Sequence, residues 1–106
     1  MKKITINGVD RPIKFGVWAI RNLANIRGKT MEETINGIDK MGVEDMMTLI
    51  YCAFLYGAKL ERLEIDFIEE DVWLWLEDKE VSDKAMSCFS EESPKPKNLK
   101  ASETGQ

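Results

Sequence analysis

Apolar and polar residues alternate at the start of the chain, which predicts two β-strands joined by a tight turn. Ile4 and Ile6 alternate with polar residues until Asn7-Gly8, and a second alternating stretch covers residues 9–15. Asn-Gly supplies the two positive φ angles that a type I′ hairpin turn needs. Pro12 lacks a backbone donor, so the second strand is expected at an edge there. Two strands are marginal alone and should pack on helices.

A helical spacing of apolar residues follows the hairpin. From Gly16 to Arg27 the apolar side chains fall on one half of a helical wheel, which predicts an amphipathic helix. Gly28 is a typical stop signal for that helix. Thr30 and Glu33 then have the spacing of a capping box, so a second helix is expected to begin there and to end near Gly42.

The third predicted helix, Val43 to Leu60, is apolar on nearly every side. Such a helix should lie at the centre of the domain and be covered by the other helices, or be covered in part by another subunit. Asp66 and Glu69 offer a second capping box for a fourth helix that runs to about Asp78. A short final helix is expected from Val81 to Phe89.

Residues 91–106 contain Pro94 and Pro96 and only one large aliphatic residue, Leu99. Because this segment cannot bury enough apolar area to offset chain entropy, we expect a disordered tail. The fold class is therefore α+β and mostly helical, with an N-terminal β-hairpin followed by four or five α-helices. These elements should form a single domain of residues 1–90.

Charge is distributed unevenly along a chain whose net charge is only −4. Residues 1–40 hold eight Lys/Arg against four Asp/Glu, whereas residues 61–83 hold two against ten. This asymmetry, together with the very apolar third helix, predicts a homo-oligomer, although solvated helix faces that happen to differ in charge are an alternative. Scattered cations and an acidic isoelectric point argue against nucleic acid as a partner.

Composition points to a soluble, cytoplasmic protein. We expect no membrane partner, because no run approaches the ~20 apolar residues of a membrane span, and we expect no signal peptide. Cys52 and Cys88 lie in apolar stretches without partners at metal-ligand spacing, so they are interpreted as buried thiols in a reducing compartment.

The chain lacks the residues that most enzymes use. It contains no histidine, the commonest general base and metal ligand, and no glycine-rich phosphate loop. The acidic run Glu69-Glu70-Asp71 does not have the alternate spacing of a calcium loop, and neither cysteine has a base or cation nearby in the sequence. We therefore expect a protein that is not an enzyme and that needs neither a cofactor nor a metal.

Several large apolar residues are not required for the inward stripes of their own helices. Trp18 lies on the polar face of the first helix beside Arg21, and Trp73 lies between acidic residues of the fourth helix, whose inward stripe is taken as Ile68, Val72, Trp75 and Leu76. Phe67 and Leu74 also fall outside that stripe. Exposed tryptophans are enriched at the energetic centres of interfaces, so the candidate protein-binding residues are Trp18, Arg21, Phe67, Trp73 and Leu74. Alternatively, the hairpin covers Trp18 and the final helix covers Trp73.

The order of these segments resembles the tail assembly chaperones of long-tailed, siphovirus-like bacteriophages and prophages. The likeness begins with Ile4-Thr5-Ile6-Asn7-Gly8, Ile13-Lys14-Phe15-Gly16 and Val17-Trp18-Ala19-Ile20-Arg21-Asn22-Leu23. It continues with Thr30-Met31-Glu32-Glu33, Leu49-Ile50-Tyr51-Cys52-Ala53 and Glu69-Glu70-Asp71-Val72-Trp73-Leu74-Trp75-Leu76. It covers about residues 1–90 and consists of structural and hydrophobic patterns rather than a catalytic motif.

The resemblance implies an assembly factor that works in the cytoplasm of the infected host. Such a protein binds the tape measure protein, keeps it soluble and recruits tail tube protein until polymerisation displaces the chaperone. Two other interpretations stay open: a different phage morphogenesis protein, such as a head-tail connector or tail completion factor, and a small regulatory binding module of a bacterial host.

Overall fold

The computed structural model describes residues 1–92, which form an α+β, mostly helical fold, as the sequence predicts. A β-hairpin comes first and five α-helices follow it, with one short 3₁₀ helix, η1, between the second and third. The elements are β1 (Lys2–Ile6), β2 (Val9–Ile13), α1 (Val17–Arg27), α2 (Met31–Asn36), η1 (Ile38–Lys40), α3 (Val43–Leu60), α4 (Glu69–Trp75) and α5 (Lys79–Glu92).

The hairpin has the predicted turn. β1 and β2 pair antiparallel, with Ile6 opposite Val9, and the two residues between them, Asn7 and Gly8, have φ angles of 53° and 81°. Both angles lie in the left-handed region that a type I′ turn requires, so the Asn-Gly signal is confirmed. Neither strand is left alone, because β2 packs on α3 and β1 packs on α5.

Helix α1 begins and ends, and α2 begins, where local signals place them, but α2 ends at Asn36 rather than near Gly42, because the chain tightens after Gly37 into the 3₁₀ helix η1. Helix α1 stops at Gly28, whose φ of 69° is left-handed, and buries the predicted apolar face, including Ile20 and Leu23. At the start of α2, the Thr30 hydroxyl oxygen accepts a hydrogen bond from the backbone N–H of Glu33 at 3.0 Å. The Glu33 carboxylate in turn accepts from the Thr30 backbone N–H at 2.9 Å, which completes the capping box.

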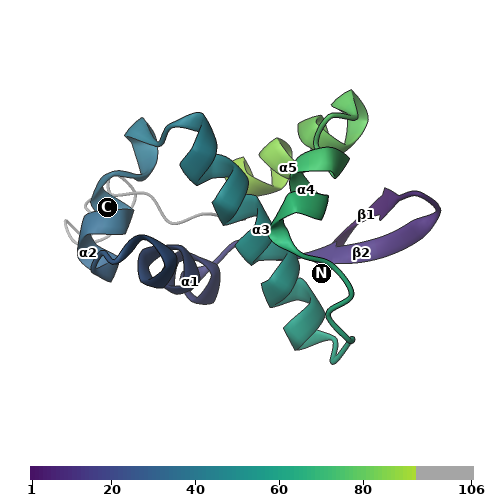
Figure 1. The fold of residues 1–106 in the computed structure, drawn as a ribbon, viewed down its shortest axis with the longest axis horizontal. Coiled ribbons are helices and arrows are strands. Elements are labelled where there is room, and N and C mark those ends of the chain that lie inside the picture. The colour runs from purple at the N-terminus through teal and green to yellow at the C-terminus, as the bar shows by residue number, and fades with distance from the viewer. Residues whose placement is uncertain (93–106) are drawn as a thin grey trace, which may run out of the picture.

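Helix α3 lies at the centre of the molecule, and its bounds match the prediction. Figure 1 shows it crossing the middle, with α1 and α2 on one side and the hairpin on the other. It packs against α1, β2 and α4, and its buried residues supply much of the core. A backbone hydrogen bond of 3.1 Å from Lys14 N–H to the Ala53 carbonyl joins the end of the hairpin to the middle of this helix.

The start of α4 differs from the prediction. Its cap is not the expected pair of Asp66 and Glu69, because the helix begins two residues later, with Ile68 at the N-cap, and Asp71 accepts a hydrogen bond of 3.0 Å from the Ile68 backbone N–H. Asp66 instead forms an ion pair with Arg11 of β2, at 2.8 Å. The helix also ends at Trp75, three residues before the expected end.

Helix α5 closes the fold against the hairpin and runs two residues past the predicted domain boundary at residue 90. Glu91 forms an ion pair with Lys2 of β1, and the Glu92 carboxylate accepts a hydrogen bond from the Phe15 backbone N–H at 2.9 Å. These contacts place the last turn of α5 inside the domain. The rest of the segment predicted as a tail, 93–106, lies outside the described residues.

Candidate protein-binding surface

Trp18 lies where α1 crosses the C-terminal half of α3. Its indole ring stacks on Tyr56 of α3, with ring centroids 5.2 Å apart and an interplanar angle of 29°. The Lys59 ammonium lies 5.8 Å from the Trp18 ring centroid. The side chain is half-buried, so the stack holds one face in place while part of the ring remains accessible. The ring that stacks on Trp18 thus comes from α3, whereas the alternative expected from the sequence was cover by the hairpin.

A groove opens beside this stack. It has a volume of about 470 Å³ and is lined by Trp18, Leu55, Lys59, Arg62, Leu63 and Ile65. Four of these side chains are apolar, and Leu63 and Ile65 are each 49% exposed. The two charged residues of the lining, Lys59 and Arg62, are both cations. The groove is therefore an apolar surface with a positive rim, built from α1, α3 and the segment that follows α3.

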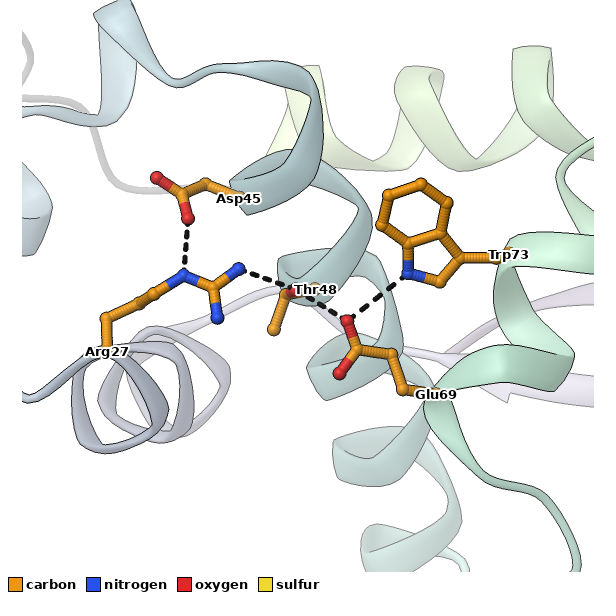
Figure 2. A network of polar contacts seen from close by, with 5 residues as sticks. All are labelled: Arg27, Asp45, Thr48, Glu69 and Trp73. Atoms are coloured by element: carbon orange, nitrogen blue, oxygen red, sulfur yellow. Dashed lines mark hydrogen bonds and ion pairs between the residues drawn. The ribbon is translucent and has the colours of Figure 1, made fainter.

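Trp73, a second predicted contact residue, lies in a different place and belongs to a polar network (Figure 2). Its Nε1–H donates to a Glu69 carboxylate oxygen at 3.2 Å, and the same oxygen accepts from the Thr48 hydroxyl at 2.6 Å. Arg27 donates to the Thr48 hydroxyl oxygen at 2.9 Å and to Asp45 at 2.6 Å. The network links α1, α3 and α4, so Trp73 helps to hold these helices together. Its ring is nevertheless half-exposed.

The remaining predicted residues are scattered, so the five candidates do not form one surface. Arg21 is exposed on α1, three residues beyond Trp18 and therefore on the same side of that helix. Leu74 is 63% exposed and lies near the hairpin turn, where it lines a small cavity with Asn7. Phe67 is a correction: it is only 7% exposed, and its ring lies against those of Tyr51, Phe54 and Trp75.

The reason for the error at Phe67 is that helix α4 begins only after it. A helical wheel extended back from α4 places Phe67 outward and Ile68 inward, but both residues precede the helix, and the wheel does not apply to them. In the structure the two residues have the opposite orientation: Phe67 is buried, and Ile68 is 59% exposed. The same extended segment contributes Leu63 and Ile65 to the groove, and sequence analysis missed both because no helical periodicity covers them.

Both cysteines of the described region are shielded from solvent. Cys52 and Cys88 are free thiols and both are buried, as predicted. Burial, with a smaller contribution from nearby Glu69, raises the pKa of Cys52 to about 12. Burial also raises the pKa of Cys88. Neutral, buried thiols are poor nucleophiles.

Within residues 1–92, no group of three or more metal-ligating side chains is close enough together to hold an ion. In the same region, no helix is both long enough and apolar enough to cross a membrane.

No protein-family model matches the chain, and no curated protein and no solved structure is similar to it at a significant level.

Proposed function

We propose that this protein is a phage tail assembly chaperone that binds the tape measure protein, keeps it soluble and promotes polymerisation of tail tube protein around it. The proposal combines the order of sequence segments described above with one structural observation. That observation is the apolar groove beside Trp18, which offers a contact surface for an exposed apolar stripe of another protein.

Two properties of the groove suit a chaperone. Trp18 is already stacked on Tyr56, so little side-chain freedom is lost when a partner covers it. Leu63 and Ile65, which also line the groove, lie outside any helix and are half exposed, so they are able to adjust to different partner side chains. A surface that holds a stripe of apolar residues without a deep specificity pocket suits a long, helical client.

The test is co-expression of the chain with overlapping fragments of the tape measure protein encoded by the same genome. At least one fragment should stay soluble only in the presence of the chain and should co-purify with it. Trp18→Ala and Leu63→Ser should reduce the yield of soluble complex. Val43→Ala is the matched control, because Val43 is 74% exposed but lies at the opposite end of α3 from the groove.

Retention of every fragment in the insoluble fraction would contradict the proposal. So would the presence of the chain as a stoichiometric component of purified virions, which would instead indicate a head-tail connector or tail completion factor. A chaperone that polymerisation displaces should be absent from finished particles.

A further inference from the structure

The turn that terminates helix α3 has an arginine, Arg62, at the position where glycine is the usual residue. The Leu63 backbone N–H donates to the Ala58 carbonyl at 2.9 Å, and the Arg62 N–H donates to the Lys59 carbonyl at 3.2 Å. This pair of bonds is a Schellman motif, whose penultimate residue must be left-handed. Arg62 accordingly has a φ of 59°, one of only two positive φ angles at non-glycine residues in the region 1–92.

The chain contains its own comparison at the end of α1. There the Lys29 N–H donates to the Ala24 carbonyl at 2.9 Å, and the left-handed position is occupied by Gly28. The same termination is thus made once with glycine and once with arginine. A left-handed backbone is disfavoured for arginine because its Cβ crowds the carbonyl oxygen, so Arg62 makes the end of α3 less stable than glycine would.

The Arg62 side chain reaches the groove but has no partner there. Arg62 and Lys59 both line it, and neither head group forms an ion pair or a side-chain hydrogen bond with another residue in the part of the chain that the structure describes. The nearest acidic residue in sequence, Glu61, faces Lys3 at 3.6 Å. A strained residue whose charged group is unpaired beside an apolar groove points to a role in binding.

We infer that the groove binds an amphipathic helix whose apolar stripe is flanked by carboxylates, and that Arg62 and Lys59 select those carboxylates. The inference rests on the proposed function of the groove as a protein-binding site. A helix is favoured over an extended strand because the groove lies between helices and a loop rather than along a sheet edge. A bound strand would find few backbone partners there, whereas a helix satisfies its own backbone hydrogen bonds.

The positive charge of the groove indicates that its partner carries acidic residues. Every charged residue in the lining is cationic, so the groove attracts a carboxylate and repels a cation. Arg62 is therefore a specificity-determining residue. The free energy that the left-handed backbone of Arg62 costs at the end of α3 is offset by binding of the partner.

The experiment titrates the full chain with two synthetic 18-residue helices by fluorescence anisotropy. Both carry the same leucine stripe, flanked by glutamates in one peptide and by lysines in the other. The glutamate-flanked helix should bind about tenfold more tightly, and the preference should shrink as salt is raised. Arg62→Gly should leave the melting temperature unchanged or raise it, yet weaken binding of the glutamate-flanked helix about fivefold.

Controls separate charge from backbone conformation. Arg62→Lys keeps the charge and should keep most of the affinity, while Lys84→Ala, which removes an exposed cation of α5 outside the groove lining, should change stability and binding little. The inference is overturned if both peptides bind equally, if neither binds, or if Arg62→Gly leaves the affinity unchanged. It is also overturned if Arg62→Gly abolishes self-association of the chain, because the occupant is then a second copy.

These outcomes are distinct from failure of the proposed function. If fragments of the tape measure protein bind the groove but acidic flanks confer no preference, the chaperone proposal stands and this inference fails. If the glutamate-flanked helix binds in an Arg62-dependent manner but no tape measure fragment does, the groove is an acidic-helix site with another client.

Discussion

Pro12 passes so close to Gly57 that no side chain fits between them. A Cβ atom on Gly57 would lie 2.3 Å from the Pro12 carbonyl oxygen, well inside van der Waals contact. The neighbouring backbone bond from Lys14 to Ala53 keeps the strand at this distance. The hairpin therefore packs on α3 through direct backbone contact, and this contact fixes the position of the first 15 residues relative to the central helix.

Gly57→Ala should destabilise the protein by roughly 3 kcal/mol or more, because the clash is with backbone and either the strand or the helix must move. Urea denaturation measures this loss. Gly37→Ala is the matched control: its φ of −94° suits alanine, and its Cβ would make only an ordinary contact of 3.4 Å. Equal stability of the two variants would mean that the hairpin does not pack closely on α3.

Thr48→Val should cost about 1 to 3 kcal/mol, since it removes the buried hydroxyl that links Arg27 to Glu69 and leaves their charges without that partner. Thr34→Val is the comparison, because the Thr34 hydroxyl donates only to the Thr30 carbonyl, which also accepts from the Thr34 backbone N–H. That change should cost under ~1 kcal/mol. Chemical denaturation of both variants checks the difference, and a Thr48→Val protein as stable as wild type would contradict the structural role of the network.

Trp18→Ala should affect partner binding more than folding. The half-buried ring is expected to contribute about 1 kcal/mol to stability through its stack on Tyr56, but ~2 kcal/mol or more to affinity if it lies at the centre of the interface. Phe54→Ala should do the reverse, because Phe54 is only 1% exposed and its loss should cost ~3 to 5 kcal/mol of folding stability. Paired denaturation and binding titrations distinguish the two. An unfolded Trp18→Ala protein would place the ring in the core.

Alkaline pH should destabilise the fold in part through Cys52. The folded protein raises the pKa of this thiol from 9.0 to about 12, so between these values the unfolded chain releases a proton that the folded chain keeps. The contribution of the neutral Cys52 thiol to folding stability is fully present below pH 9. It is lost as the pH rises toward 12, at up to about 1.4 kcal/mol per pH unit. Because lysines also titrate in this range, the measurement is the difference in pH dependence between wild type and Cys52→Ala. Identical slopes would contradict the shift.

Sequence alone determined the features that depend on neighbours a few residues apart. The Asn7-Gly8 turn, the Thr30–Glu33 capping box and the bounds of the central helix Val43–Leu60 all follow from local backbone geometry and from the 3.6-residue period. The central position of that helix also follows, because a helix apolar on nearly every side must be covered. These signals need no knowledge of which segments meet in space.

Tertiary structure decided which aromatic residues are covered and where the groove forms. Phe67 is buried because rings from α3 and α4 surround it, and Trp18 is half-buried because Tyr56 lies beneath it. Leu63 and Arg62 reach the groove because a left-handed turn ends α3 and directs the following segment past Trp18. A helical wheel ranks the faces of one helix but says nothing about extended segments or about neighbours distant in sequence, so only the packed structure could show this surface.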